Sequence, residues 1–185
     1  MEILSKNPAL LLIDLQKGWE HTEHWGGNRN NPEAEKVAKA LLEMWRNHGL
    51  PVFHIIHSSK DPNSELHPSK PGYEMLDEFK PKAGEPLIVK QVNSGFIGTD
   101  LKEQLEKAGL NTLVIAGLTT NHCVSTTTRM AGNFGFEVYL VADATATFDR
   151  KGINGEIFPA ELVHQTALAS LNEEFATVIE SSELS

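Results

Sequence analysis

Continuous apolar runs recur along the chain and alternate with segments of helical spacing. The runs lie at residues 9–13, 51–56, 87–89, 112–116, 137–141 and 176–179. Strands that are apolar at successive positions, rather than at every second one, are typical of a parallel sheet buried on both faces. The pattern therefore predicts a Rossmann-like α/β fold, a three-layer α/β/α sandwich around a mostly parallel, six-stranded sheet.

Helical segments fill the intervals between these runs. Residues 33–48 carry apolar side chains at helical spacing and are followed by a glycine, which suits a helix C-terminus. We expect Thr99 to cap a second helix, residues 121–133 to form a third, and Pro159 to open the last. The alternation of strand and helix is that of βαβ units.

The segment from His57 to Pro86 is long, polar and rich in proline. A loop of this length in a compact domain usually has a function. We expect it to pack over the active-site end of the sheet or against a second subunit, and the sequence leaves both alternatives open.

Size and charge restrict the class of protein. A chain of 185 residues fits one domain, here residues 1–185. Its net charge of −9 argues against nucleic acids and anionic membranes as partners, because both require clustered basic residues. The apolar run at residues 8–13 is too short for a membrane span or a signal peptide, so we expect a cytoplasmic protein.

Polar side chains follow the predicted strands at the points where they end. These residues are Asp14, His57, Lys90, the turn leading to Cys123, and Asp143. In an open parallel sheet the ligand site lies beyond the carboxyl ends of the strands. Asp14, Lys90 and Cys123 together form a chemically sensible set, with a nucleophile, a cation and a base.

Cys123 is the only cysteine in the chain, so an internal disulfide is excluded. A thiol with a pKa of about 8.5 is mostly protonated at neutral pH. Either Lys90 and the helix N-terminus hold it as a thiolate, or Asp14 removes its proton. A lone cysteine is more often a small buried hydrophobe, and a lone lysine a surface residue. Their convergence on one sheet edge favours catalysis.

Several further side chains are candidates for contact with a substrate. They are Gln16, Trp19, His57, Asn93, Phe96 and His122. Each has a structural alternative, because large aromatic residues are usually part of the core and buried amides often bond the backbone. No glycine-rich dinucleotide motif opens a helix, so no cofactor is expected.

Three stretches of the sequence resemble the isochorismatase-like cysteine hydrolase family, which includes nicotinamidase and N-carbamoylsarcosine amidase. They are residues 90–96, 117–124 and 141–146, and the resemblance runs through almost the whole chain, from residues 10–16 to the strand near Val178. The resemblance implies a catalytic triad, matched here by Asp14, Lys90 and Cys123. It also implies homodimers or homotetramers.

The resemblance implies two further features of the site. A cis peptide ahead of the nucleophile corresponds to Leu118–Thr119, and it would aim the Thr119 N–H, beside that of Cys123, at an oxyanion. Some members bind a metal through an Asp-x-His pair after the second strand. This chain instead has His57-Ser58-Ser59 there, and His54 and His57 point to opposite faces of a strand, so we expect no metal.

The sequence therefore predicts a cysteine-dependent hydrolase that cleaves a C–N bond in a small amide, ureide or carbamoyl compound through a thioester. One alternative is isochorismatase chemistry, the hydrolysis of a vinyl ether. Another is a redox-sensing or binding protein, whose thiol captures an oxidant or ligand without turnover. The partner in either enzymatic case is a small molecule.

Overall fold

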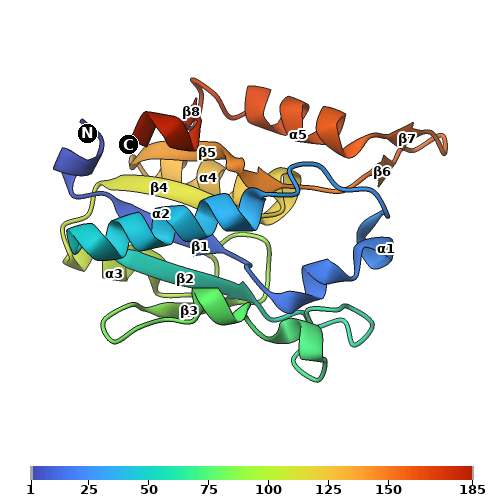
Figure 1. Cartoon of the computed structure of the whole chain (residues 1–185), viewed down its shortest axis with the longest axis horizontal. Coiled ribbons are helices and arrows are strands. Elements are labelled where there is room, and N and C mark those ends of the chain that lie inside the picture. Colours follow the sequence, from blue (N-terminus) through green and yellow to red (C-terminus); the bar gives the residue numbers. More distant parts are fainter. Residues whose placement is uncertain (1, 185) are drawn as a thin grey trace.

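The computed structural model describes residues 2–184, and a six-stranded parallel sheet forms its centre (Figure 1). The strands lie in the order β3-β2-β1-β4-β5-β8. Their bounds are β1 (Ala9–Ile13), β2 (Val52–His57), β3 (Leu87–Lys90), β4 (Thr112–Leu118), β5 (Glu137–Ala146) and β8 (Thr177–Ile179). All neighbouring pairs in this sheet are parallel, so the predicted fold class is confirmed.

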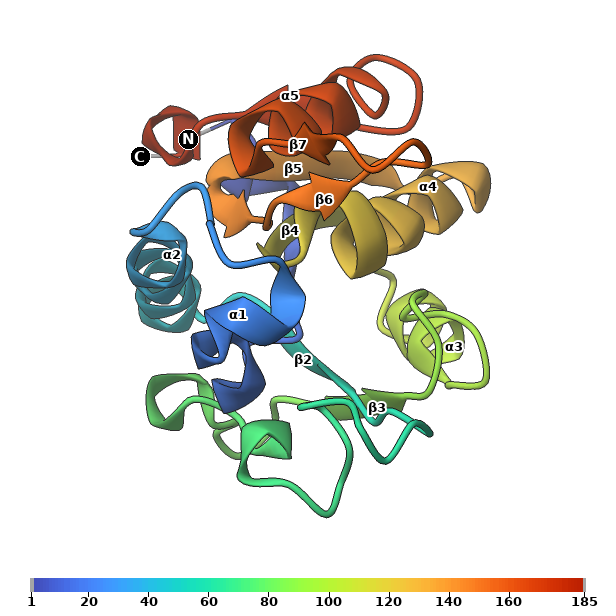
Figure 2. The ribbon, with the colours of Figure 1, turned by 90° about the vertical axis from the view of Figure 1, so that its right-hand side faces the viewer.

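Helices cover the sheet on both faces. They are α1 (Thr22–Trp25), α2 (Ala34–His48), α3 (Leu101–Lys107), α4 (Ser125–Asn133) and α5 (Ala160–Ala169). Figure 2, an end-on view, separates α2 on one side of the sheet from α3 and α4 on the other. The amphipathic pattern that predicted α2 is explained by this position, since its apolar stripe faces the sheet.

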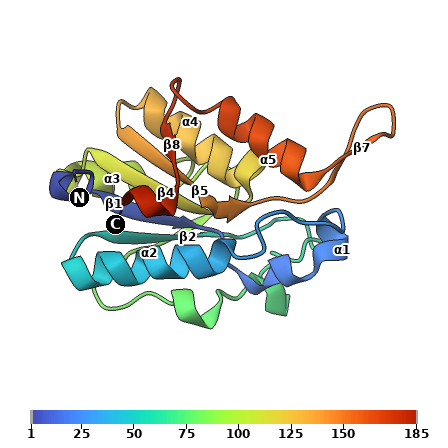
Figure 3. The ribbon, with the colours of Figure 1, turned by 45° about the horizontal axis from the view of Figure 1, so that its top comes forward.

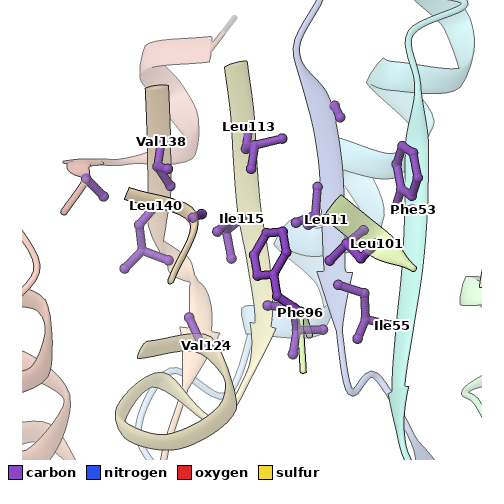
Figure 4. Close-up of a cluster of buried hydrophobic side chains, with 14 of the residues drawn as sticks. Leu11, Phe53, Ile55, Phe96, Leu101, Leu113, Ile115, Val124, Val138 and Leu140 are labelled. Atoms are coloured by element: carbon purple, nitrogen blue, oxygen red, sulfur yellow. The ribbon is translucent and has the colours of Figure 1, made fainter. Parts of the chain in front are cut away.

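Alternate residues of each strand enter two separate cores. In β1, Leu11 and Ile13 pack with α3 and α4, whereas Leu10 and Leu12 pack with α2. Figure 4 shows the first core, in which Phe96 lies among side chains from several strands. Burial on both faces is why the central strands are apolar at every position.

Two local predictions were wrong. Thr99 does not cap a helix, because Asp100 occupies the N-cap position of α3 and the Thr99 hydroxyl donates to the Gly95 carbonyl at 2.5 Å. The sheet is also not covered everywhere: at the edge strand β3, Leu87 and Val89 are each 45% exposed. An edge strand pairs on one side only, and here one face also meets solvent.

Strand β5 continues past its predicted end at residue 141 and reaches Ala146. Beyond it, β6 (Arg150–Lys151) and β7 (Ile157–Phe158) form a short antiparallel hairpin that projects from the body of the molecule (Figure 3). Among residues 2–184, no helix has the length and apolar character needed to cross a membrane.

Candidate active site

The strand register determines which side chains meet at the carboxyl edge of the sheet. Ile13 of β1 pairs with Ile55 of β2 and with Gly117 of β4, and His57 pairs with Lys90. The residues that follow these pairs therefore emerge at one edge, which faces the viewer in Figure 2 behind α1 and β6. This edge is where the predicted catalytic residues gather.

Asp14 follows β1 directly and adopts a left-handed conformation with φ of 53°. A non-glycine residue is uncommon there, and such positions cluster at functional sites. Its N–H donates to the Ile55 carbonyl at 2.7 Å, and its own carbonyl accepts from the Trp19 indole. A side chain at Gly117 would overlap the Ile13 carbonyl, so only glycine permits this close approach of β4 to β1.

The Asp14 carboxylate and the Lys90 ammonium form a fully buried ion pair, with Lys90 Nζ 2.7 Å from Asp14 Oδ2. Lys90 Nζ also lies 3.2 Å from His57 Nδ1. Burial alone would lower the Lys90 pKa, but interactions with Asp14 and with Cys123, the Asp14 charge first among them, outweigh burial and raise it. Lys90 is therefore a cation, and His57 Nδ1 must accept its hydrogen bond.

Cys123 lies in a π-helical turn, Thr120–Val124, that leads from β4 into α4. Its Sγ, an Asp14 carboxylate oxygen and a His57 ring nitrogen all lie within 4.8 Å of one another. Burial and then the Asp14 charge raise the Cys123 pKa far above its usual range, although Lys90 opposes them. Of the two sequence-based alternatives, the electrostatics favour a resting thiol that gives its proton to a base.

One oxygen of the Asp14 carboxylate is free to accept a proton. Asp14 Oδ2 accepts from Lys90, whereas Asp14 Oδ1 is buried and has no hydrogen-bond partner among the described residues. A buried carboxylate oxygen without a partner is costly, and such groups are usually retained for a function. The peptide bond that precedes the nucleophile turn, Leu118–Thr119, is cis.

A cavity of about 260 Å³ opens above this cluster. Four of the predicted substrate contacts line it, together with Thr119 and Cys123: they are Trp19, His57, Asn93 and His122. Its wall also contains residues that the sequence did not assign to substrate binding: Trp25, Ser64, Leu66 and Arg150. The cavity therefore joins the chemical cluster to groups from loops and from the β6–β7 hairpin.

The sequence model of the isochorismatase domain matches residues 8–183. The chain belongs to the isochorismatase family. The family protein YrdC of Bacillus subtilis, described as uncharacterized, is 44% identical over 181 residues, which are 98% of this chain and 96% of YrdC. The family's typical α/β fold and the observed sheet agree.

Solved structures of isochorismatase-family proteins superpose closely. A hydrolase of the family from Chromobacterium violaceum has a TM-score of 0.91 and 43% identity, covering 97% of this chain and 92% of that one. N-carbamoylsarcosine amidase from Thermoplasma acidophilum has a TM-score of 0.73 and 26% identity, covering 94% and 96%. The sequence-based resemblance to this family is confirmed.

Two predicted substrate contacts have other positions in this isochorismatase-family chain. Gln16 is fully buried, and its amide donates to the carbonyls of His57 and Tyr73 and accepts from the His57 N–H. It joins β2 to the long loop and has no part in the cavity wall. Phe96 is 8% exposed and packs in the core against Phe134, with ring centroids 5.4 Å apart.

The long segment after β2 covers the active-site end, the first of its two predicted locations. Ser64 and Leu66 from this segment line the cavity. Asp143, by contrast, is not part of the site. It lies within β5 rather than at its end, and its carboxylate accepts hydrogen bonds from the Ser181 N–H and hydroxyl.

Some isochorismatase-family members hold a metal beside the triad, and the potential ligands here are Asp14, His57 and Cys123. They fit a metal ion poorly, because the Lys90 ammonium already donates to Asp14 and abuts His57. A divalent cation at this point would be repelled by that charge, and its ligands would lose Lys90 as a partner. We therefore derive no step through a metal.

Proposed function

We propose that the protein is a cysteine hydrolase that cleaves the C–N bond of a small amide, ureide or carbamoyl compound. The observation that carries this proposal is the buried Asp14–Lys90 ion pair beside Cys123, with Asp14 Oδ1 left without a partner. A nucleophile, a base with an empty acceptor position and a fixed cation are the parts that acyl transfer requires.

The chemistry follows from the protonation states. Cys123 Sγ attacks the carbonyl carbon while Asp14 Oδ1 takes the thiol proton, so no thiolate need be stored beforehand. Lys90 pairs with the Asp14 carboxylate before the attack and stabilises the charge that develops. The N–H groups of Thr119 and Cys123 are suited to bind the oxyanion, because both residues line the cavity.

Collapse of the tetrahedral intermediate breaks the C–N bond. Asp14 delivers its proton to the departing amine or ammonia, and a thioester with Cys123 remains. Asp14, anionic again, then accepts a proton from water as the water oxygen attacks the thioester. A second collapse releases the carboxylic or carbamic acid and returns the proton to Cys123 Sγ.

The size of the cavity supports a compact substrate. Its volume of about 260 Å³ lies below the roughly 300–1,000 Å³ of pockets that hold drug-sized ligands. The similarity to an N-carbamoylsarcosine amidase supports the carbamoyl or amide class. A redox sensor is disfavoured because such thiols are exposed and have a low pKa, whereas Cys123 is 7% exposed and its pKa is raised.

A panel of small amides, ureides and carbamoyl compounds, with isochorismate beside them, tests the proposal. We expect wild-type protein to release ammonia or amine, and Cys123→Ala and Cys123→Ser to lose this activity by at least about 10³-fold. Mass spectrometry of acid-quenched wild-type protein should find an acyl group on Cys123. Melting temperatures equal to that of the wild type would exclude misfolding.

Two outcomes would reject the proposal. Hydrolysis of isochorismate that survives in Cys123→Ala would identify vinyl-ether chemistry instead. Absence of turnover across the panel, together with rapid consumption of the thiol by peroxide, would favour redox sensing.

A further inference from the structure

Arg150 enters the cavity from a rigid support. It lies in β6 and pairs with Phe158 of β7. The preceding residue, Asp149, anchors this base of the hairpin, because its Oδ1 accepts from the N–H of Ala160 at 2.7 Å and from the Asn28 amide at 3.1 Å. Asp149 is thus committed to the start of α5 and does not serve as the partner of Arg150.

The other arginines of the chain have partners. Arg29 and Arg46 each make two hydrogen bonds to a glutamate, Glu35 and Glu85 respectively. Arg129 bonds Ser125 and lies over the ring of Phe175, 4.7 Å from its centroid.

Arg150 differs from these arginines. Among residues 2–184 its side chain has no hydrogen bond or ion pair, and its Nε is buried without an acceptor. Arg150 is half-buried, and burying part of a guanidinium without an acceptor is costly because that part loses its hydration. A ligand in the cavity that Arg150 lines would supply the acceptor.

The cavity carries a net positive charge. Lys90 is neutralised by Asp14 at its floor, and none of the residues that line the wall is acidic. His57 and His122 are both shifted toward the neutral form, since burial and a nearby cation lower the pKa of each. Arg150 therefore leaves about one uncompensated positive charge in the cavity of a protein whose net charge is −9.

We propose that Arg150 binds a carboxylate of the substrate, at the end opposite the C–N bond that is cleaved. A guanidinium matches the planar carboxylate with two parallel hydrogen bonds, which fixes orientation as well as supplying affinity. This inference rests on the proposed hydrolase function and narrows its substrates. They are short amides, ureides or carbamoyl compounds that also carry a carboxylate.

Protection of Cys123 against alkylation tests the subsite without any turnover. Wild-type protein is treated with iodoacetamide at pH 9 in the presence of acetate, propionate, butyrate or inorganic phosphate, and labelling is measured by mass spectrometry. We expect at least one of the carboxylates to slow labelling at millimolar concentration. Arg150→Gln should weaken that protection roughly 10- to 100-fold, the usual effect of losing a charged hydrogen bond.

Two variants control for charge and folding. Lys151→Gln removes the same charge from the next residue, which is exposed. Carboxylates should protect Cys123 in this variant as well as they do in the wild type. Arg150→Lys keeps the charge but not the pair of parallel N–H donors, and should retain part of the protection. Lack of protection in the wild type, equal protection in Arg150→Gln, or stronger protection by phosphate than by every carboxylate would overturn the proposal.

Turnover separates this inference from the proposed function. Succinamate and succinamide share one amide end, but only succinamate carries a carboxylate at the other. We expect wild-type protein to prefer succinamate in kcat/KM, and the preference to fall at least tenfold in Arg150→Gln. Hydrolysis of both without preference would leave the hydrolase standing and reject the subsite. Protection by carboxylates without turnover of any amide would support the subsite and reject the hydrolase.

Discussion

Two ionic clusters in this molecule are built from the same kinds of groups but differ in how completely the carboxylate is hydrogen-bonded. Each contains a carboxylate, a basic side chain and a histidine from β2. In the first, Glu85 accepts from Arg46 through both oxygens at 2.7 Å, and also from the His54 ring and the Lys82 N–H. These bonds, first of all those from Arg46, lower the Glu85 pKa to about 2.

The second cluster leaves its carboxylate incomplete. Asp14 Oδ2 accepts from Lys90, but Oδ1 accepts from nothing among the described residues, and one of the two oxygens lies within 4.8 Å of Cys123 Sγ. If both Asp14 oxygens accepted hydrogen bonds, as both Glu85 oxygens do, no acceptor position would remain for the Cys123 proton. If the proposed function holds, the first cluster serves stability and the second gives up stability for chemistry, since a buried ion pair contributes little net free energy.

Asp14→Asn is expected to break this contrast most strongly. Hydrolysis should fall by about 10³-fold or more, because the variant has no base for the thiol proton. Labelling of Cys123 by iodoacetamide at pH 8 should instead rise roughly tenfold, since the negative charge that raises the Cys123 pKa is gone while Lys90 remains. Rates of both reactions, measured on one preparation, check the prediction.

Asp77→Asn is the matched control, because it makes the same change in an exposed pair with Lys80. It should alter neither rate. Slower labelling of Cys123 in Asp14→Asn would contradict the assignment of a protonated resting thiol. Wild-type labelling should itself keep rising above about pH 10.5, where an ordinary thiol with a pKa of about 8.5 is already almost fully ionised.

Glu85→Gln is expected to affect the other cluster, and stability rather than turnover. The Glu85 pKa falls from 4.5 to about 2 on folding, so the ionised carboxylate stabilises the fold by about 3 kcal/mol. Because the folded-state pKa is the lower one, this contribution is complete above pH 4.5 and is lost as the pH falls toward 2. The variant should lose about 3 kcal/mol at pH 7, measured by urea unfolding, and approach the wild type near pH 2.

Glu74→Gln provides the comparison, since Glu74 pairs with Lys17 at the surface, where solvent screens the pair, and the change should alter stability much less. In Glu85→Gln the kcat/KM should stay within about twofold of the wild type. A large loss of turnover would show that the two clusters are coupled and that the division between stability and chemistry is wrong.

Sequence reasoning found the floor of the site because a parallel sheet fixes it. Strands that are apolar throughout are typical of a parallel sheet covered on both faces, and parallel strands deliver their carboxyl ends to one edge. Asp14, Lys90 and the turn before Cys123 could therefore be brought together without coordinates. Their positions depend on strand order and register, which long apolar runs specify strongly.

The remaining features depend on contacts that periodicity does not encode. Arg150 reaches the cavity from a hairpin of two-residue strands, and Gln16 joins β2 to the long loop, so each needs the loop path to be known. The direction of the Cys123 pKa shift depends on the balance of burial, Asp14 and Lys90. The sequence predicts that Asp14, Lys90 and Cys123 lie close together, but it does not give the relative size of their effects on the Cys123 pKa.

The two β2 histidines give the smallest and sharpest test of the comparison. They lie three residues apart, and their different partners place one in each cluster. His54 Nε2 is 2.9 Å from Glu85 Oε2, and His57 Nδ1 is 3.2 Å from Lys90 Nζ. Burial, the largest cause in both cases, lowers both pKa values, so each ring is neutral at pH 7 and acts through its hydrogen bonds.

Replacing each histidine by glutamine should give opposite results. His54→Gln is expected to lower the free energy of unfolding by about 1–2 kcal/mol, the usual contribution of a hydrogen bond to a charged group. Its kcat/KM should stay within about twofold of the wild type. His57→Gln should lower kcat/KM roughly tenfold, because the His57 ring no longer holds Lys90 in position, and should cost less than about 1 kcal/mol in stability. Urea unfolding measures the change in stability of both variants, and steady-state kinetics measure the change in kcat/KM. Equal effects of the two changes would mean that a shared β2 distortion, and not separate ionic clusters, governs both properties.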